Sequence, residues 1–384
     1  MYDLTEEQTI LKETIGRLAR ERVAPGATER DQAAKFPWDM VELFRENGLF
    51  GADFPEAHGG SEMGLLALCL AIEEIAKACA SSSVILMVHE LGAMPLLLAG
   101  SREQKERWLP ELAAGEALIA FGLTEPGAGS DVAGLTTRAV RDGDEYVING
   151  RKVFISHGDV AKYVVLAVVT AAEGSPAKGQ SLLVVEQGRP GFSIGKKEDK
   201  MGIRASTTCE LIFEDCRVPA GNLLLEEGSG FPILMKTLDF TRIPVAAQAV
   251  GIAQGAVDAA VAYAKERVQF GKSLIKMQGI QFMLAEMTAK VEAARQLTYK
   301  AAAVYQDLPK DMSRVPREAV RFSAMAKLVA ADTAMEVTTD ALQVLGGYGY
   351  TKDYPLERMM RDAKITQIYE GTSQVQKLVV AGTL

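Results

Sequence analysis

A single carboxylate near the end of the chain stands among residues that suit proton transfer. Residues 368–376 read IYEGTSQVQ, so Glu370 lies between a tyrosine and Gly371. An acid that is buried and aimed at a substrate has a raised pKa and can act as a general base. A structural role is the alternative, because Ser373 and Gln376 are spaced as a capping box for a last helix, and acids before a helix complement its dipole.

A glycine-rich segment offers a second place for chemistry. The sequence LTEPGAGSD at 123–131 follows a predicted strand and can present backbone N–H groups and hydroxyls to a flat polar ligand or a pyrophosphate. Ordinary turns have the same composition, so a connecting loop is the alternative. Val132 stands where GxGxxG needs its third glycine, and GxxxGK at 191–196 is shorter than a P-loop. Rossmann-type nicotinamide binding and P-loop ATP chemistry are therefore not indicated.

Composition and charge limit the class of protein. The chain has 384 residues, of which 48% are hydrophobic and 24% charged, and its formal charge is -8. These values predict a folded protein of two or three subdomains and make nucleic acid an unfavourable partner. The first residues have the pattern of an amphipathic helix and not of an export signal, so a cytoplasmic location is expected. The four cysteines form no CxxC pair and the three histidines lack metal-ligand spacing, so we expect neither disulfides nor a metal site. No apolar run reaches the roughly 20 residues of a membrane-spanning helix, so no membrane association is expected.

Hydrophobic periodicity divides the chain into three parts. A helical period runs through 1–116, where Thr5 and Gln8 are spaced as a capping box, and returns over 223–384, where long helices predict a four-helix bundle. Between them, 117–222 consists of short β-rich runs, and its Asn149-Gly150 pair is typical of a two-residue hairpin turn. The predicted fold is α+β and mainly α: an N-terminal helical domain, a central antiparallel β-barrel or sandwich domain, and a C-terminal bundle.

Motifs along the whole chain resemble those of the acyl-CoA dehydrogenase family. They are, in order, LTEPGAGSDVAGL from 123, NGRKVFISHG from 149, KMGIRAST from 200, FEDCRVP from 213, LDFTR from 238, ERVQFGK from 266, QVLGGYGY from 343 and MMRDAKITQIYEGTSQVQ from 359. The resemblance implies that family's three-domain fold, a homotetramer built as a dimer of dimers, FAD as cofactor and an acyl-CoA thioester as substrate. It also implies fatty acid β-oxidation as the setting and an electron-transfer flavoprotein as the acceptor.

The same resemblance implies a role for the lone acid. In this family the acid of YEGT removes the proton next to the thioester carbonyl, while the flavin takes hydride from the next carbon. The matching residue is Glu370. Some members carry the base instead in the segment matching LDFTR, where this chain has Thr241, which cannot serve as a base. The resemblance therefore implies Glu370 as the only base.

Residues that contact FAD in the family also have counterparts here. Those of the central domain are Phe121, Leu123, Thr124, Ser130, Phe154, Ile155 and Ser156. Those that reach the FAD of a neighbouring subunit are Arg267, Gln269, Phe270, Gln278, Gln343, Gly346 and Gly347, and those after the base are Thr372 and Gln374. At 154 and 156 this chain has Phe and Ser where the family often has Trp and Thr. Arg suits a pyrophosphate because of its forked donors, although a solvated helix charge is the alternative for Arg267.

The resemblance places substrate contacts on both sides of the base and on the helix after the sheet. Tyr369 and Gly371 flank Glu370, and Ser130, Asp239 and Arg242 match residues near the CoA moiety. An ion pair at a helix start is the alternative for Asp239 and Arg242.

The acyl pocket of the family matches residues 81–95 of this chain. That stretch contains no Arg, which disfavours a dicarboxylic substrate, but it does contain Glu90. Glu90 is either a helix surface charge or a second acid that faces the pocket and suits cyclic or conjugated acyl groups. A flavin oxidase of the same fold is a further alternative for the function.

Overall fold

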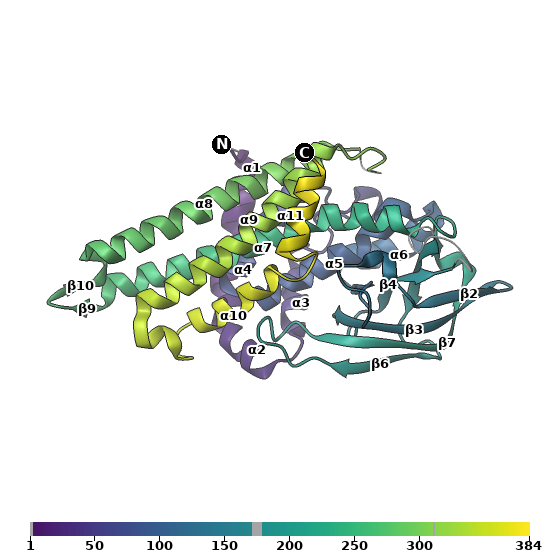
Figure 1. Ribbon diagram of the computed structural model, residues 1–384, viewed down its shortest axis with the longest axis horizontal. Coiled ribbons are helices and arrows are strands. Elements are labelled where there is room, and N and C mark those ends of the chain that lie inside the picture. The colour runs from purple at the N-terminus through teal and green to yellow at the C-terminus, as the bar shows by residue number, and fades with distance from the viewer. Residues whose placement is uncertain (1–2, 171–178, 310–311) are drawn as a thin grey trace.

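Helices make up most of the computed structural model, which describes residues 3–170, 179–309 and 312–384. Figure 1 shows an elongated molecule, with the tips of the long C-terminal helices at one end and the β-sheet at the other. The mainly helical α+β class predicted from the sequence is confirmed.

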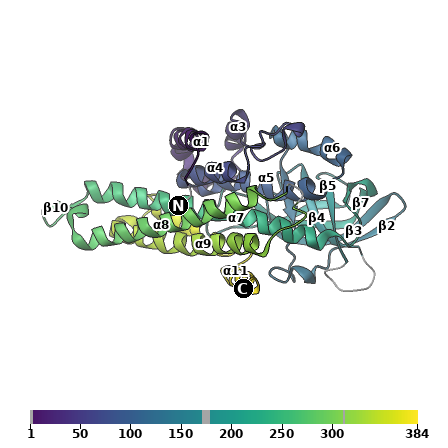
Figure 2. The same cartoon turned by 90° about the horizontal axis from the view of Figure 1, so that it is seen from above.

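The N-terminal part forms a helical layer. Its helices are α1 (Glu6–Leu18), α2 (Ala27–Ala33), α3 (Trp38–Glu46), α4 (Leu65–Ala78), α5 (Ala80–Ala99) and α6 (Arg102–Ala113). The capping box predicted for α1 is present, because Thr5 Oγ1 accepts the Gln8 N–H at 3.2 Å and Gln8 Oε1 accepts the Thr5 N–H at 3.0 Å. In Figure 2, α4 and α5 lie between the outer helices α1 and α3 and the C-terminal helices. This middle position explains why α4 and α5 are apolar on nearly every side.

The central part is the predicted β domain, but its strands form one open sheet and do not close into a barrel, which was one of the two predicted arrangements. Its strands are β1 (Ile119–Gly122), β2 (Arg138–Asp142), β3 (Glu145–Ser156), β4 (Tyr163–Val169), β5 (Gln180–Glu186), β6 (Phe192–Lys197), β7 (Thr208–Pro219) and β8 (Leu223–Leu224). The order is β6-β7-β3-β2-β4-β5-β8, with β1 parallel to β4. Strands β2 and β4 share the single pair Arg138 and Val169, so two antiparallel halves meet at a narrow parallel join.

The hairpin turn predicted at Asn149-Gly150 is wrong. Strand β3 continues through both residues, and a register shift against β7 between Ile148 and Gly150 marks a bulge. Gly150 has a φ of 152, and a glycine inside a strand often marks such a bulge. The turn between β2 and β3 instead lies at Gly143, whose φ is 63.

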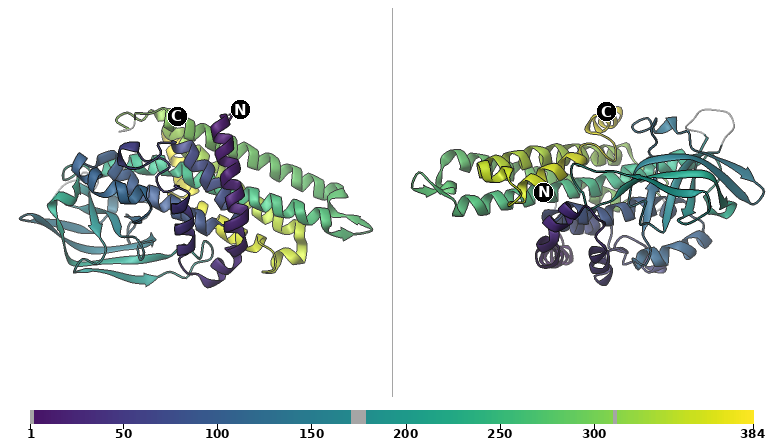
Figure 3. Two further views of the ribbon diagram at one scale, coloured as in Figure 1. Left: turned by 180° about the vertical axis from the view of Figure 1, so that it is seen from behind. Right: turned by 90° about the horizontal axis from the view of Figure 1, so that it is seen from below.

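Three long helices dominate the C-terminal part. The helices are α7 (Gly230–Glu266), α8 (Gln278–Gln306), α9 (Arg317–Leu345), α10 (Leu356–Thr366) and α11 (Ser373–Gly382), with a small hairpin of β9 (Val268–Gln269) and β10 (Lys272–Ser273) between α7 and α8. Helices α7, α8 and α9 pack against one another, and α10 and α11 pack on α9. Both views of Figure 3 show the three long helices side by side. Helix α7 contacts β5 near one end and β10 at the other, so it joins the sheet to the far tip.

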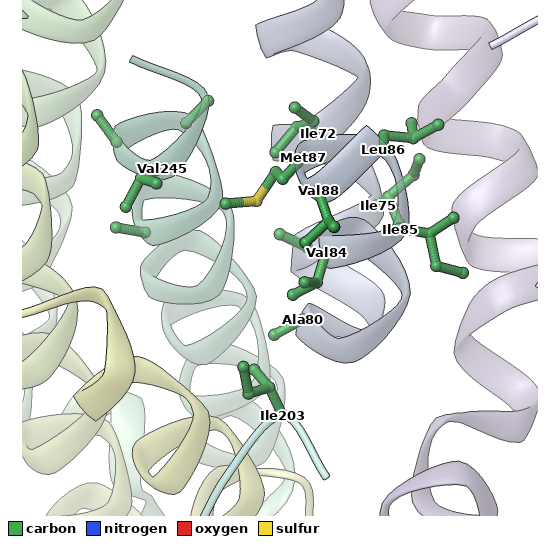
Figure 4. Close-up of a cluster of buried hydrophobic side chains, with 14 of the residues drawn as sticks. Ile72, Ile75, Ala80, Val84, Ile85, Leu86, Met87, Val88, Ile203 and Val245 are labelled. Carbon is green, nitrogen blue, oxygen red and sulfur yellow. The ribbon is translucent and has the colours of Figure 1, made fainter. Parts of the chain in front are cut away.

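A large hydrophobic core lies where α4, α5 and α7 meet. Figure 4 shows Val84, Met87 and Val88 of α5 in this region, with Met87 pointing toward Val245 of α7. Helices α5 and α7 are long and apolar enough to cross a membrane by length and composition. Most of each apolar stretch is buried inside the fold, 83% for α5 and 72% for α7, so core packing accounts for their composition.

Candidate active site

Glu370 lies in the turn that joins α10 to α11, residues 367–373. Its φ is 55 and that of Gly371 is 86, so two consecutive residues adopt the left-handed conformation. This conformation costs a residue other than glycine about 1–2 kcal/mol, and it persists only where surrounding contacts hold it. The turn presents the Glu370 side chain to α7, where it meets Thr241.

Thr241 is the hydrogen-bond partner of the Glu370 carboxylate. Its Oγ1 lies 2.8 Å from Glu370 Oε2 and 2.9 Å from the carbonyl oxygen of Thr237. A hydroxyl has one proton, so Thr241 donates to only one of these acceptors at a time. It donates to Glu370 when the carboxylate is ionised. When Glu370 is protonated, the acid can donate to Thr241, which then donates to Thr237, so the site accommodates both protonation states of a base.

Opposing influences act on the pKa of Glu370. Burial raises this pKa above its ordinary value, while the hydrogen bond from Thr241 and the positive charges of Arg242 and Lys327 act against the rise. Arg242 is 5% exposed and forms an ion pair with Asp239, one turn earlier on α7. A carboxylate whose proton affinity is raised by burial, with a hydrogen bond and two cations acting against the rise, is suited to the role of a general base.

Helix α9 fixes the 367–373 turn from a second direction. Lys327 Nζ donates to the carbonyl oxygen of Gly371 at 2.7 Å. Asp332 Oδ1 accepts from Gln367 Nε2 at 2.6 Å and from Ser373 Oγ at 3.0 Å. Contacts from this one helix therefore reach both ends and the middle of the turn.

The predicted capping box at Ser373 and Gln376 is wrong. The N-cap of α11 is Thr372, whose side chain accepts an N–H from the first turn of the helix. Gln376 Nε2 instead donates back to the carbonyl oxygens of Glu370, at 3.1 Å, and Gly371, at 2.9 Å. The side chains of Ser373 and Gln376 bond to Asp332 and to the carbonyl oxygens of the turn, so neither is available for a capping box. Gln374, the other residue predicted to contact FAD after the base, is exposed on α11.

Tyr369 connects the turn to α5 through Gln248 of α7. The Tyr369 hydroxyl donates to Gln248 Oε1. Gln248 Nε2 lies 3.1 Å from Ser83 Oγ and 3.3 Å from the carbonyl oxygen of Ala80, and Gln248 is fully buried. Since Ser83 belongs to the 81–95 stretch predicted to line the acyl pocket, one chain of hydrogen bonds joins that stretch to the residue beside Glu370.

The central-domain residues predicted to contact FAD lie on and beside β1 and β3. Phe121 and Ile155 are buried, Ser130 is exposed, and Leu123, Thr124 and Ser156 are partly exposed. Phe154 differs from them because its side chain is 64% exposed and its φ is 58, at a register shift of β3 against β7. A bulge redirects a side chain, and an exposed aromatic ring is suited to contact with a flat ligand.

A buried ion pair braces this region. Lys152 is fully buried on β3, and its Nζ lies 2.6 Å from Glu125 Oε1 and 3.1 Å from the carbonyl oxygen of Leu123. Burial would raise the pKa of Glu125, but Lys152 and the hydrogen bonds from Thr136 and Thr137 outweigh it and lower the pKa to about 2. Burial lowers the pKa of Lys152 to about 8. The pair ties the 123–131 segment to β3.

The residues predicted to contact the FAD of a neighbouring subunit gather at the tip where α7 and α9 end and α8 begins. Those that line a surface cavity of about 510 Å³ there are Arg267, Gln269, Gln343, Gly346 and Gly347. The Arg267 guanidinium lies 5.4 Å from the centre of the Tyr348 ring. Phe270 is 94% exposed at the tip, with a φ of 51, and Gln278 is exposed at the start of α8. Figure 1 shows this tip, marked by β9 and β10, at the end farthest from the sheet.

The two groups of residues fit two parts of an FAD molecule. Aromatic and hydroxyl side chains near β3 suit the flat flavin ring, and at the tip an arginine, amide side chains and two glycines suit a pyrophosphate and its adenosine. A β-carbon added at Gly346 or Gly347 would meet no atom of the described residues within 4 Å, so there is space beside both backbones.

Glu90 is buried in α5, which excludes the surface-charge alternative. Its side chain is 3% exposed, and its Oε1 has no hydrogen-bond partner in the described part of the chain. Burial, and then the negative charge of Asp53, raise the pKa of Glu90 well above its ordinary value. The role of a second acid stays a prediction.

Four residues that support the site were not found from the sequence: Lys152, Lys327, Asp332 and Gln248. Lys327 had a usable signal, because it stands in the otherwise apolar run AMAKLVAA of a helix, and a lysine on a buried helix face calls for a partner. Asp239 and Arg242 form the ion pair that was the structural alternative for them, and Arg242 also acts on Glu370.

Comparisons with known proteins cover almost the whole chain. The acyl-CoA dehydrogenase N-terminal domain matches residues 5–116, the middle domain matches 120–216 and the C-terminal domain matches 228–384. The short-chain specific acyl-CoA dehydrogenase of Clostridium acetobutylicum is 49% identical, with 100% of this chain and 99% of that protein covered. The cyclohex-1-ene-1-carbonyl-CoA dehydrogenase of Geobacter metallireducens is 48% identical with the same coverage.

Solved structures agree with this result. Butyryl-CoA dehydrogenase from Megasphaera elsdenii matches with a TM-score of 0.94 at 45% identity, covering 100% of this chain and 99% of that one. A chain solved in work on the electron transferring flavoprotein of Acidaminococcus fermentans matches with a TM-score of 0.94 at 47% identity, covering 99% and 98%. With its three domains matched in order, the protein belongs to the acyl-CoA dehydrogenase family of FAD-dependent oxidoreductases.

Proposed function

We propose that this acyl-CoA dehydrogenase acts on a short-chain acyl-CoA and that Glu370 is its base. The observation that carries the proposal is the setting of the Glu370 carboxylate: partly desolvated, 2.8 Å from the Thr241 hydroxyl and facing the charges of Arg242 and Lys327. The similarity to a short-chain specific relative supports the size of the acyl group. The product is a 2-enoyl-CoA.

Two residues of the turn and three of α7 have tasks in the proposed reaction. Glu370 takes the proton from the carbon next to the thioester carbonyl. Thr241 donates to the carboxylate before transfer and accepts from the acid afterwards, so neither side chain has to move far. Tyr369, held by Gln248, excludes water beside the base, and Arg242 lies where the family binds CoA.

FAD, when bound, supplies the acceptor for the hydride from the β carbon. Phe154 and Ser156, with their neighbours on β1 and β3, would hold the flavin ring, and the cavity around Arg267 would hold the distal part of the cofactor. Thr372 and Gln374 complete the predicted contacts after the base.

We further propose that the enzyme is a homotetramer built as a dimer of dimers. The separation of the two FAD-contact groups supports assembly, since the tip of one subunit can complete the site of another. The exposed Phe270 at the tip supports the same arrangement, because a large apolar side chain in water favours a covered position.

The partner and setting of the enzyme are also proposals. An electron-transfer flavoprotein is the proposed acceptor, supported by the similarity to the chain from Acidaminococcus fermentans. A cytoplasmic location is supported by four buried free cysteines, which suit a reducing compartment. Fatty acid β-oxidation is the proposed pathway and rests on the short-chain relative.

A cyclic or conjugated acyl-CoA is the second candidate substrate. The observation in its favour is the buried Glu90 with an unpartnered oxygen, together with the similarity to a cyclohex-1-ene-1-carbonyl-CoA dehydrogenase. Burial and the charge of Asp53 favour the protonated form of Glu90, which cannot accept a proton, so the one-base reaction at Glu370 is the first candidate.

One titration tests the proposed function. The purified enzyme is mixed without oxygen with butyryl-CoA, longer straight-chain acyl-CoAs and cyclohexenecarbonyl-CoA, and bleaching of the flavin absorbance is followed. We expect the fastest bleaching with butyryl-CoA. Preference for the cyclic thioester would favour the second candidate, and rapid peroxide formation on admitting air would indicate an oxidase. Bleaching by no thioester would contradict the proposal.

A further inference from the structure

Lys327 is a fully buried cation that the proposed reaction does not use directly. Its side chain is 0% exposed in α9, and its Nζ donates to the Gly371 carbonyl at 2.7 Å. Within residues 3–170, 179–309 and 312–384 this carbonyl is its one hydrogen-bond acceptor, although an ammonium group has three donors. Burying a cation with so few partners disfavours folding, so its position beside Glu370 requires an explanation.

The charged groups around Lys327 come from three elements. Burial lowers the pKa of Lys327 to about 8, and the foremost opposite charge acting against this is that of Glu370 in the 367–373 turn. Arg242 of α7 opposes the cation, and Asp332 of α9 favours it. Since Arg242 is already paired with Asp239, Lys327 is the cation near Glu370 that has no carboxylate of its own within the described residues.

The hydrogen bond from Lys327 to the Gly371 carbonyl stabilises an unfavourable backbone conformation. Glu370 and Gly371 are both left-handed, and the Gly371 carbonyl is where Lys327 and Gln376 converge, at 2.7 and 2.9 Å. Losing these contacts would free the turn to adopt a right-handed conformation, which a glutamate prefers. The carboxylate would then leave Thr241.

We propose that Lys327 is a positioning residue for the base, holding the left-handed turn through the Gly371 carbonyl and keeping the Glu370 carboxylate ionised through its charge. This inference rests on the proposed function, because the base it serves is the one assigned there. Lys327 contacts the backbone and neither the substrate nor the reacting atoms, so it is not a catalytic residue.

Two variants distinguish the effect of the Lys327 charge from its structural effect. Lys327→Met removes the charge and keeps an unbranched side chain, whereas Lys327→Gln removes the charge and keeps an amide donor. Lys377→Met, at an exposed lysine of α11, is the matched control. For each protein we would measure the rate of flavin bleaching by an acyl-CoA that bleaches the unmodified enzyme, from acid to alkaline pH, together with the melting temperature.

We expect both Lys327 variants to move the acidic limb of the rate profile to higher pH, by about one unit, because a lost positive charge raises the pKa of Glu370. On the acid side this is about a tenfold slower rate. Lys327→Met also loses the donor to the Gly371 carbonyl, so its rate should in addition be lower than that of Lys327→Gln at every pH. The melting temperature should change little, because burial lowers the pKa of Lys327 to about 8, and relief of this buried charge offsets the loss of the hydrogen bond to Gly371. The control should match the unmodified enzyme in both measurements.

Several outcomes would overturn the inference. An acidic limb that stays in place in Lys327→Met would do so, as would a rate that falls equally at all pH values with a lower melting temperature, which indicates a structural role alone. A profile restored in Lys327→Gln would show that the charge is not needed. Failure of the proposed function is distinguishable, because then the unmodified enzyme would not bleach with any acyl-CoA, or Glu370→Gln would still bleach.

Discussion

The 367–373 turn and the tip of the helical bundle differ in how their side chains are supported. Around the turn, Glu370, Tyr369 and Gly371 each have a buried partner within the same chain. At the tip, Phe270 is 94% exposed and Gln269 bonds to the adjacent Val268 carbonyl. The comparison teaches that one chain positions the proposed base unaided, whereas the tip has the composition of a binding surface that a ligand or another subunit completes.

The strongest test of this contrast is Glu370→Gln. We expect flavin reduction to slow by about 10²–10⁴-fold or more, because an amide cannot accept the proton. FAD content and thioester binding should stay unchanged, since the amide still accepts the Thr241 hydrogen bond. Stopped-flow absorbance measures the first and spectral titration with acyl-CoA the second. Normal bleaching by this variant would contradict the role of Glu370.

A substitution at the tip should weaken FAD binding and leave the chemistry at Glu370 unchanged. Arg267→Ala should weaken FAD binding by roughly 10- to 100-fold, the effect of losing one or two charge-assisted hydrogen bonds to a pyrophosphate. The acidic limb of the rate profile should not move in enzyme saturated with FAD. Fluorescence titration of the apoprotein with FAD measures the affinity, and Lys265→Ala, at an exposed lysine of the same helix end, is the control. Unchanged FAD affinity would leave Arg267 as a solvated helix charge.

A smaller effect is expected from Thr241→Val. The hydrogen bond from Thr241 lowers the pKa of Glu370, so its loss should raise that pKa. The acidic limb of kcat/KM should then move to higher pH, with about a tenfold loss on the acid side for each unit. Thr241→Ser keeps the hydroxyl and should keep the original profile. An equal loss at every pH would point to altered packing instead.

The smallest effect is expected at Glu90, away from both regions. Its pKa is raised in the folded state, so the folded protein binds more protons than the unfolded chain, and stability is lost as pH rises above the ordinary value of 4.5. Glu90→Gln removes this loss. Its melting temperature should match that of the unmodified protein at acid pH and exceed it increasingly toward neutral pH, with Glu46→Gln at an exposed site as control. A constant difference across pH would contradict the titration of Glu90.

Much of the site could be predicted from the sequence because the chemistry is local in the chain. Glu370, Gly371 and Thr372 are adjacent, and so are Phe154, Ile155 and Ser156. Each set therefore forms a contiguous motif that can be recognised in the sequence. The alternation of helical and strand periods likewise predicts the α+β class. Contacts between distant segments leave no such trace. Lys327 meets Gly371 across 44 residues, and Lys152 meets Glu125 across 27.

The errors have physical reasons of the same kind. Asn149-Gly150 suits a tight turn, but a glycine also suits a strand bulge, and pairing with β7 decided between them. Ser373 suits an N-cap, but Asp332 of α9 takes its hydroxyl, which leaves Thr372 as the cap. The sheet has the strands for a barrel, and whether it closes depends on how its edges are placed, which periodicity does not record.

Helix α7 carries Thr241 and Arg242 about a third of the way along its length, and Lys265 lies in its last turn, directly before the C-cap residue Arg267. From Arg242 to Arg267 the helix advances by about 37 Å at 1.5 Å per residue. Adding or deleting one residue between Arg242 and Arg267 would rotate one relative to the other by about 100°. Arg267 would then no longer point toward the proposed FAD contact. The number of residues in α7 therefore fixes both the distance and the relative direction of the side chains at 242 and 267. Insertions and deletions should be tolerated in the loops and not within this helix.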